Sequence, residues 1–384
     1  MHGPVHIIFV TAVCLSVASI VYCLLCVWAG VKFARWRATT AIPNADSPPI
    51  SILKPLKGTD PEMYEALRSH CVQDNPAYEI LFGISSADDP AAGIVRKLIA
   101  EFPAHKIRLA LCEKRLGANG KVSTLAQLAP LAEHEFLLVS DSDIRVDPGY
   151  LRTVASELSQ PGVGMVTCLY RGVSATTLPS KLEALSISTD FAAGVLAARS
   201  IEHTLKFGLG STLAFRRSDL EKIGGFAALV DHLADDYELG KRIAERGLKI
   251  ELSRVVVETH LPAYHWSDFF SHQLRWARTI RASRPGGYVG LIFTFTLPWA
   301  LAAFLLEPQS WTGPLLVAAI LARYTMAAVC AGSVLNDRHS TQNFWLLPLR
   351  DFLAVAVWVG GLFGRKIAWR GEQFYLEKGK LKPV

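Results

Sequence analysis

Two aspartates one residue apart, Asp141 and Asp143, directly follow the apolar run 135–140. Carboxylates with this spacing can share a hard divalent cation that keeps further coordination positions for phosphate oxygens and water. A solvated turn is the alternative for an isolated pair, but the position after a buried strand favours a metal site. The pair therefore predicts a site for a divalent ion and a phosphorylated ligand.

Two further acidic clusters can take part in the same chemistry. Asp88 and Asp89 precede a proline, where a carboxylate can accept hydrogen bonds from a nucleotide base or ribose, or can cap a helix. Asp235 and Asp236 open a helical stretch, and the helix dipole alone favours one acid at such a position. Because two acids are adjacent there, we expect one of them to be the general base for a hydroxyl group.

Cationic residues could meet the phosphates. The stretch 117–121 can present backbone N–H groups and the Lys121 ammonium to a diphosphate. In the stretch 267–284, Arg275 can clamp a leaving diphosphate while the Trp276 indole packs beside it. Three later arginines have anchoring at lipid headgroups as their alternative role: Arg278, Arg281 and Arg284.

The elements that must position these residues alternate between β-rich and helical runs. Strands are expected over 50–53, 78–85, 106–112 and 135–140, and helices over 61–72, 90–102 and 121–132. This alternation predicts an α/β fold with a Rossmann-like, mostly parallel sheet, whose ligands bind beyond the carboxyl ends of the strands. The sequence has no GxxxxGK[ST] loop, which argues against an ATP-driven machine.

The composition predicts that part of the chain lies in lipid. Hydrophobic residues make up 51% of the 384 residues and charged residues 19%, and the mean hydropathy is +0.26. Residues 7–31 are long and apolar enough for a transmembrane anchor, and the basic residues after it place the next segment in the cytoplasm: Lys32, Arg35 and Arg37. The net charge of +6, without a basic run interleaved with aromatics, argues against nucleic acid as a partner.

Domain boundaries follow from the same pattern. A globular domain is expected over 47–287, in which the apolar stretch 178–199 is either an interfacial flap or a buried helix. A membrane region is expected over 289–363, with apolar runs at 289–306, 311–335 and 344–363.

The basic tail, 364–384, conflicts with three C-terminal crossings. Crossings by all three runs would place the tail outside, although it carries Arg365, Lys366, Arg370, Lys378, Lys380 and Lys382. The third run also contains Pro348, Arg350 and Asp351, which are costly in lipid unless they pair or face a cavity. We therefore expect a cytoplasmic tail and a run 344–363 that is re-entrant or interfacial.

Together these segments resemble the ceramide glucosyltransferase family, family 21 of the glycosyltransferases, which has the GT-A fold. The resemblance covers nearly the whole chain and is carried by Leu53-Lys54-Pro55-Leu56-Lys57-Gly58, Asp88-Asp89-Pro90-Ala91, Gly117-x-Asn119-x-Lys121, Asp141-Ser142-Asp143-Ile144-Arg145-Val146, Asp235-Asp236-Tyr237 and Arg275-Trp276.

The resemblance implies a role for each motif. It implies that Asp89 holds the uridine of a UDP-sugar, that Asp141 and Asp143 bind its diphosphate through Mg²⁺ or Mn²⁺, and that Asp236 is the catalytic base. Arg275 and Trp276 are expected to serve catalysis. Substrate contacts are expected from the remaining motif residues: Lys54, Asn119, Lys121, Asp235 and His272.

Three departures separate this chain from the ceramide enzymes. Those enzymes have DSG where this chain has Asp141-Ser142-Asp143, and the usual (Q/R)xxRW motif has His272 in its first position here, with Gln273 shifted by one. The acceptor-side histidine expected near Asp190 is missing. The chain looks closer to the bacterial branch associated with hopanoid biosynthesis, which implies transfer of N-acetylglucosamine to a polyhydroxylated hopanoid.

The sequence thus predicts a multi-pass integral membrane enzyme, in a bacterial inner membrane, whose GT-A domain faces the cytoplasm. It is expected to transfer one sugar, with inversion, from UDP-N-acetylglucosamine or UDP-glucose to a hydroxyl of a membrane lipid, a hopanoid polyol or, as the alternative, ceramide. A processive polysaccharide synthase shares the motifs but normally needs more spans. A non-enzymatic membrane module leaves several acids around one cleft unexplained.

Overall fold

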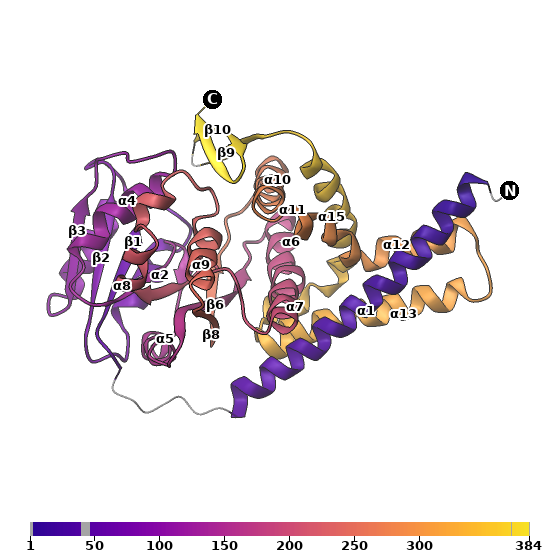
Figure 1. Ribbon diagram of the computed structural model, residues 1–384, viewed down its shortest axis with the longest axis horizontal. Helices are drawn as coiled ribbons and strands as arrows, with labels where there is room; N and C mark the ends of the chain where they lie inside the picture. Colours follow the sequence, from indigo (N-terminus) through magenta and orange to yellow (C-terminus); the bar gives the residue numbers. More distant parts are fainter. Residues whose placement is uncertain (1–2, 40–46, 370, 384) are drawn as a thin grey trace. The chain divides into compact units, whose positions relative to one another are not determined.

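The computed structural model describes residues 3–39, 47–369 and 371–383, so Arg370 of the basic tail lies outside the described residues. The chain forms two compact units. The sheet unit consists of Thr40–Tyr170, Glu202–Pro262 and Phe374–Val384. The helical unit consists of Met1–Thr39, Arg171–Ile201 and Ala263–Gln373. Figure 1 shows the elements of both units.

The sheet unit contains an eight-stranded mixed sheet of order β3-β2-β1-β4-β7-β6-β8-β5. Its strands are β1 (Ile50–Pro55), β2 (Tyr78–Ile84), β3 (Lys106–Leu111), β4 (Phe136–Val139), β5 (Ile144–Arg145), β6 (Val163–Val173), β7 (Leu213–Arg216) and β8 (Lys249–His260). The strands β3, β2, β1 and β4 are parallel, while β7 pairs antiparallel with both β4 and β6, and β5 pairs antiparallel with β8. The α/β prediction is confirmed, and the four predicted strands end within two residues of their expected positions.

Helices cover the sheet because its apolar strands bury both faces. Ile52, Ile80 and Leu138 are fully buried in one core with side chains of the neighbouring helices. The helices of the unit are α2 (Met63–Cys71), α3 (Ala91–Glu101), α4 (Gly120–Leu128), η1 (Ala129–Leu131), α5 (Tyr150–Leu158), α8 (Arg217–Lys222), η3 (Phe226–Leu229) and α9 (Asp235–Glu245). The predicted helices correspond to α2, α3 and α4 with η1.

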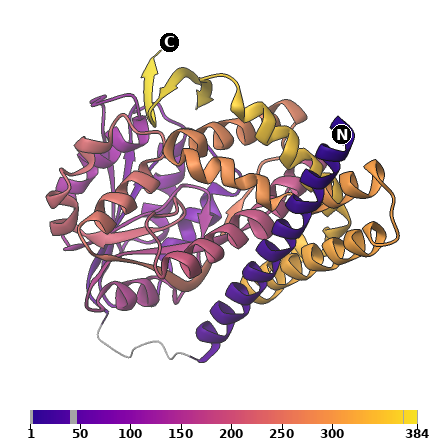
Figure 2. The ribbon, with the colours of Figure 1, turned by 45° about the vertical axis from the view of Figure 1, so that its right-hand side comes forward.

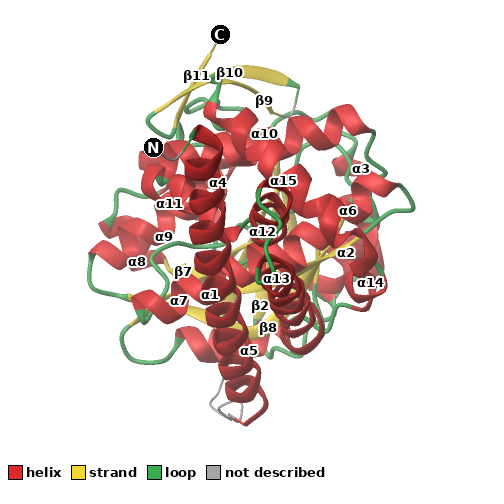
Figure 3. Ribbon diagram, turned by 90° about the vertical axis from the view of Figure 1, so that its right-hand side faces the viewer, coloured by secondary structure: helices red, strands yellow, loops and turns green. Residues whose placement is uncertain are grey.

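The end of the chain, 372–383, forms two further strands. Figure 3 shows β10 (Glu372–Glu377) and β11 (Lys380–Pro383) in a small sheet apart from the large one. The two strands pair antiparallel, with Leu376 opposite Leu381. The sequence pattern indicates only a basic tail in this region.

The helical unit is built around α1 (Pro4–Thr39), which lies beside two C-terminal helices, α12 (Thr296–Leu306) and α13 (Thr312–Ala327), as Figures 1 and 2 show. Its other elements are α6 (Leu178–Ser186), η2 (Ile187–Phe191), α7 (Ala192–Glu202), α10 (Trp266–Ser283), α11 (Pro285–Gly290), η4 (Leu291–Thr294), η5 (Ala328–Val334), α14 (Arg338–Gln342), η6 (Phe344–Leu346), α15 (Leu347–Leu362) and β9 (Lys366–Trp369). Of the two roles weighed for 178–199, burial fits the structure, since Leu182, Leu185 and Leu196 are buried.

Within the part of the chain that the structure describes, three helices are long and apolar enough to cross a membrane: Pro4–Thr39, Thr312–Val334 and Phe344–Gly361. The pair Pro285–Thr294 and Thr296–Leu306 passes the same test together but is bent by 55°. The loop between α12 and α13 lies at the N-terminal end of α1, where His6 Nδ1 is 2.9 Å from Glu307 Oε1.

The helix α15 packs along α10. Arg278 donates hydrogen bonds to the carbonyl oxygens of Phe363 (3.2 Å) and Lys366 (2.8 Å), and Arg281 donates to those of Leu362 and Gly364. These guanidinium groups therefore satisfy carbonyls at the C-terminal end of α15, a role that differs from the headgroup anchoring weighed for them above.

Candidate active site

Asp141 and Asp143 lie where the parallel part of the sheet ends. Asp141 follows β4 after Ser140, and Asp143 directly precedes β5. The Thr259 hydroxyl of β8 donates a 2.6 Å hydrogen bond to Asp143 Oδ2. Burial raises the pKa of Asp143, and the Asp141 carboxylate raises it further. The turn therefore holds negative charge at a desolvated position, which favours a bound cation.

Lys54 supports this turn from β1. Its side chain is fully buried, and Nζ donates to Ser140 Oγ at 3.2 Å and to the Asp141 carbonyl oxygen at 2.9 Å. The parallel pairing of Leu53 with Val139 sets this contact, because Lys54 and Ser140 are the residues that follow this pair. Burial lowers the pKa of Lys54 to about 7, although Asp141 and Asp143 act in the opposite direction. Lys54 thus fixes the main chain that carries Asp141.

Lys121 joins two of the acidic clusters. Its Nζ lies 2.7 Å from Asp141 Oδ1 and 3.4 Å from Asp235 Oδ2. Burial disfavours the charged ammonium, but the two carboxylates more than offset this and raise the pKa of Lys121 above its usual value. The structure therefore brings together three of the predicted site residues, one each from the turn after β4, from α4 and from α9.

Asn119 positions Lys121 from the N-terminus of α4. Its side-chain oxygen caps the helix by accepting from the Val122 N–H at 3.1 Å, and its Nδ2 donates to the His232 carbonyl oxygen at 2.7 Å. The backbone N–H of Asn119 donates to the Val230 carbonyl oxygen at 2.7 Å, and that of Ala118 donates to Asp231 Oδ1 at 3.0 Å. These two N–H groups of the 117–121 stretch bind the neighbouring loop. In this structure it is the Lys121 ammonium of the stretch that contacts the carboxylates of Asp141 and Asp235.

Asp235 and Asp236 occupy the first turn of α9. Asp236 Oδ1 accepts the Tyr237 N–H at 2.7 Å. Burial raises the pKa of Asp236 to about 6, the neighbouring Asp235 adds to the rise, and the Lys121 ammonium opposes it. A carboxylate with a pKa close to the working pH is suited to accept a proton from a hydroxyl group.

Asp141 and Asp236 converge on one point. A Cβ atom placed on Gly210, just before β7, would lie 3.3 Å from Asp141 Oδ2 and 3.3 Å from Asp236 Oδ2. Glycine leaves this space between the two carboxylates open. The metal-binding and base candidates therefore face the same position, although they are far apart in the sequence.

Asp89 stands between β2 and α3 and contacts the loop after β1. Its Oδ1 accepts the Ala91 N–H at 2.9 Å, which is the helix-capping role weighed above, and its two oxygens are each 3.1 Å from the Gly58 nitrogen. Asp60 of the same loop accepts the Ser142 hydroxyl of the Asp141–Asp143 turn. The loop 56–60 thus connects Asp89 to the acidic turn, and Asp89 remains a candidate for the nucleoside.

His272, Arg275 and Trp276 lie on α10 of the helical unit, where their predicted contact with the nucleotide stays a prediction. The centroid of the Trp276 ring lies 5.0 Å from that of the His272 ring and 6.2 Å from that of the Phe191 ring. Glu183 of α6, fully buried, holds this helix. Its Oε1 is 3.2 Å from His272 Nδ1, and its Oε2 accepts a 2.6 Å hydrogen bond from Gln273 Nε2.

Sequence reasoning missed Glu183. An acid in the mostly apolar stretch 178–199 was the available signal, because such a group needs a partner when it is buried.

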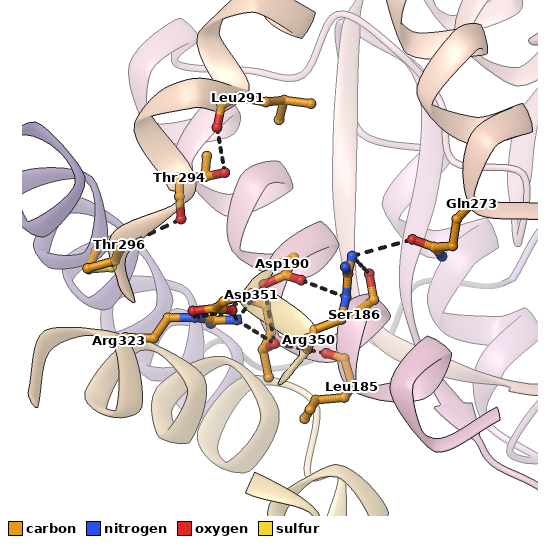
Figure 4. A network of polar contacts seen from close by, with 12 residues as sticks. Leu185, Ser186, Asp190, Gln273, Leu291, Thr294, Thr296, Arg323, Arg350 and Asp351 are labelled. Carbon is orange, nitrogen blue, oxygen red and sulfur yellow. Dashed lines mark hydrogen bonds and ion pairs between the residues drawn. The ribbon is translucent and has the colours of Figure 1, made fainter. Parts of the chain in front are cut away.

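A second buried network joins α13, α15 and η2 (Figure 4). The Arg323 guanidinium donates to Asp351 from Nε (3.0 Å) and Nη2 (2.8 Å) and to Asp190 Oδ1 at 2.7 Å. Arg350 donates to Ser186 Oγ at 2.6 Å, and its Nε lies 3.3 Å from Asp190 Oδ2. Two arginines and two aspartates balance in charge, so the polar residues of the third apolar run are paired, as their position in that run requires.

Comparison with known proteins identifies relatives over most of the chain. The sequence model of Glycosyl transferase family 21 matches residues 10–382. Ceramide glucosyltransferase 3 of Caenorhabditis elegans is 24% identical over 364 residues, which cover 91% of this chain and 77% of the relative. Ceramide glucosyltransferase 1 of the same organism is 24% identical over 358 residues, which cover 88% of this chain and 73% of the relative.

A solved structure shows the same fold. The mannosyltransferase PcManGT from Pyrobaculum calidifontis, in complex with GDP-Man and Mn²⁺, matches with a TM-score of 0.54 and 21% sequence identity. The match covers 92% of this chain and 97% of that protein. The mixed sheet of the present chain is therefore that of the GT-A glycosyltransferases.

Proposed function

The chain belongs to glycosyltransferase family 21, and we propose that it transfers one sugar from a UDP-sugar to a hydroxyl group of a membrane lipid. The observation that carries the proposal is the convergence of Asp141 and Asp236 on the position in front of Gly210. A sugar donor bound through Asp141 would place its anomeric carbon within reach of a hydroxyl bound at Asp236. UDP-N-acetylglucosamine and UDP-glucose are the two donors proposed.

Asp236 is the proposed base. Its carboxylate accepts the proton of the lipid hydroxyl while that oxygen forms the new bond to the anomeric carbon and the bond to the diphosphate breaks. A single displacement of this kind inverts the configuration of the anomeric carbon. The pKa of about 6 leaves Asp236 mostly ionised at neutral pH and still basic enough to take up the proton.

The leaving diphosphate gains negative charge as the bond breaks. We propose that the Lys121 ammonium, which lies beside Asp141, stabilises this charge. Arg275 of α10 is proposed as a second cation with the same role. Removing one preorganised donor of this type typically costs a factor of about 10² to 10³ in rate. Trp276 is proposed to pack beside the nucleotide sugar, and Asp89 to hold the uridine.

Asp141 and Asp143 are the proposed ligands of Mg²⁺ or Mn²⁺. Across residues 3–39, 47–369 and 371–383, no three His, Cys, Asp or Glu side chains form a metal-binding group. One or two carboxylates combined with phosphate oxygens are the usual donor set for Mg²⁺. Burial, with the neighbouring Asp141 carboxylate, raises the pKa of Asp143, and a bound cation would favour its ionised form. When bound, the ion would neutralise charge on the diphosphate. The Mn²⁺ held by PcManGT supports a divalent ion in a related fold.

A hopanoid polyol is the proposed acceptor. It is supported by the departures from the ceramide enzymes, above all Asp143 in place of glycine and the absence of a histidine near Asp190. Ceramide is the second candidate, because both C. elegans relatives bear the name ceramide glucosyltransferase. Either lipid would reach the enzyme by lateral diffusion in the bilayer.

The proposed topology places the N-terminus outside and the sheet unit in the cytoplasm, in a bacterial inner membrane. In this topology α1 crosses the membrane once. The bent pair 285–306, which contains α12, and the helix 312–334, which contains α13, cross as a hairpin, since the loop between them lies beside His6 at the outer end of α1. We propose that α15 is interfacial. It packs along α10, which carries Asp268, Arg275, Arg278 and Arg281 and so is too polar for the hydrocarbon core.

The test uses purified full-length protein with radiolabelled UDP-glucose or UDP-N-acetylglucosamine in separate tubes, each with ceramide or a hopanoid polyol. Chromatography should reveal a single-sugar lipid whose formation stops in Asp236→Asn but not in Asp74→Asn, an exposed acid on the same unit. A polymeric product on a gel would point to a polysaccharide synthase. Absence of UDP release with any lipid extract would reject the proposed activity, whereas near-normal turnover in Asp236→Asn would reject the proposed base.

A further inference from the structure

The C-terminal strands β10 and β11 form a hairpin with a two-residue turn. Glu377 is paired with Lys380, and the two residues between them, Lys378 and Gly379, have φ angles of 48° and 80°. Positive φ at both turn positions is characteristic of the type I′ turn, which matches the twist of the strands it joins. The hairpin is therefore a defined element of the sheet unit.

One edge of this hairpin binds the loop that leads into α9. The backbone N–H of Leu381 donates to the Asp231 carbonyl oxygen at 2.7 Å, and the N–H of Leu233 donates to the Gly379 carbonyl oxygen at 3.1 Å. His232 and Lys380 form an antiparallel bridge between these two bonds. The loop thus extends the hairpin as a third, very short strand.

The pairing register explains why this edge is available. In a two-residue hairpin the residues beside the turn, here Glu377 and Lys380, exchange hydrogen bonds with each other, and the next pair does not. Leu381 belongs to that next pair, so its N–H points away from β10 and toward the loop. The Leu381 side chain is buried, as is that of Leu233.

The opposite side of the same loop is bound by the start of α4. Val230, Asp231 and His232 accept hydrogen bonds from residues 118 and 119, as described above. Glycine at position 117 permits this approach, because a Cβ atom there would lie 2.6 Å from the Val230 side chain. The loop is therefore held between α4, which carries Lys121, and β11.

The loop ends two residues before the proposed base. Ala234 is the N-cap residue of α9 and has no side-chain cap, so the orientation of the first turn, with Asp235 and Asp236, depends on the main chain that precedes it. The path from Leu381 to Asp236 runs through five consecutive residues, 231–235.

We propose that the hairpin formed by β10 and β11 is a positioning element that holds the loop 230–234 and, through it, the carboxylates of Asp235 and Asp236 in the geometry needed for transfer. This inference rests on the proposed function, since it assigns to the hairpin the placement of the proposed base. The donor-binding candidates Asp89 and Asp141 lie outside this loop. Loss of the hairpin contact therefore affects the chemical step more than donor binding.

The experiment compares three full-length variants. Leu381→Pro removes the N–H that binds Asp231 while leaving the bonds between β10 and β11 in place. Leu381→Ala keeps that N–H and is the rescue variant. Lys382→Ala is the control. It alters the neighbouring residue, whose exposed side chain pairs with Glu377.

Hydrogen exchange measured without substrate reports the contact itself. In Leu381→Pro we expect faster exchange in a peptide covering 229–236 and unchanged exchange in β1 and β2, with Lys382→Ala like the unmodified protein. Steady-state kinetics then report the consequence: kcat of Leu381→Pro should fall by about tenfold to a hundredfold, the cost of a misplaced catalytic group. The donor KM should change by less than about threefold.

Each outcome decides a separate question. Unchanged exchange at 229–236 in Leu381→Pro overturns the docking of the hairpin. Faster exchange with unchanged kcat, or a rise in donor KM without a fall in kcat, overturns its role in placing the base. If the unmodified protein transfers no sugar to any acceptor, the proposed function fails and the catalytic part of the inference fails with it, while the exchange data still judge the contact.

Discussion

Lys121 Nζ lies 2.7 Å from Asp141 Oδ1, so the chain supplies its own cation to the acidic end of β4. The same ammonium lies 3.4 Å from Asp235 and lowers the pKa of Asp236. One side chain therefore connects the candidate metal site with the candidate base.

The Lys121→Met variant should move the acidic limb of the pH–rate profile to higher pH. Asp236 must be ionised to accept a proton, so activity should rise with pH through its pKa of about 6. Without the ammonium, one influence that lowers this pKa is lost, and ionisation then requires a higher pH. Initial rates from pH 5 to 9 check this, with Lys121→Arg, which retains the charge, as the control. An unchanged acidic limb in Lys121→Met would show that the group titrating there is not Asp236.

The Gly210→Ala variant should lower transfer by about 10²-fold, as expected when reacting groups are displaced by about 1 Å. The added methyl carbon would lie 3.3 Å from both Asp141 Oδ2 and Asp236 Oδ2 and would occupy the space between them. Rates at saturating donor measure the effect. Gly93→Ala is the control, because its Cβ would meet nothing within 4 Å and helix α3 tolerates alanine. Equal activity of the two variants contradicts a reaction centre in front of Gly210.

Thr259→Val should weaken the response to the divalent ion. The Thr259 hydroxyl lowers the pKa of Asp143, which burial and Asp141 raise, so its removal should favour the protonated carboxyl group. A protonated carboxyl group binds a cation poorly, and higher Mn²⁺ or Mg²⁺ concentrations should then be needed for half-maximal activity. Metal titrations at two pH values measure the shift. Thr259→Ser keeps the hydroxyl and should titrate like the unmodified protein.

Breaking the Arg323 network should destabilise the helical unit. Arg323→Met leaves Asp351 and Asp190 without their main cation, and loss of one partner from a buried ion pair costs about 3–5 kcal/mol. Thermal unfolding in detergent should show a lower midpoint. The double variant Arg323→Met with Asp351→Leu should recover most of this loss, and a double variant no more stable than Arg323→Met would contradict the proposed energetic coupling of the pair.

The proposed topology predicts which ends of the chain a protease can reach. In sealed vesicles with the cytoplasmic face inside, a tag in the loop 307–311 should be cleaved, because this loop lies beside the N-terminal end of α1. A tag after residue 383 should be protected until detergent is added. Cleavage of that tag in intact vesicles would overturn the interfacial placement of α15.

The parallel half of the sheet could be predicted from the sequence because each strand and helix carries its own local pattern. Ile52, Ile80 and Leu138 belong to short apolar runs that end at polar strand ends, and those ends do carry Asp141 and Asp89. The antiparallel half could not be derived in this way. β7 follows β4 in the sheet although 73 residues separate Val139 and Leu213 along the chain, and pairing over that distance depends on packing rather than on local periodicity.

The contacts of individual side chains could not be predicted from the sequence either. The motif at Lys54 predicts a substrate contact. Only the pairing of β1 with β4 shows that the Lys54 ammonium donates a hydrogen bond to the main chain of Asp141. Likewise, the sequence presents residues 364–384 as a basic segment. The backbone hydrogen bonds between β11 and the loop at Asp231 and Leu233 arise from tertiary contacts, which the local sequence does not show.

The binding of β11 to the loop before α9 also constrains how the chain can be threaded through a bilayer. Residues 202–262 and 374–383 belong to one folded body, so they must lie on the same face of the membrane. The segment between them can then traverse the lipid only an even number of times. Of the three apolar runs in that segment, at most two can therefore make a full passage.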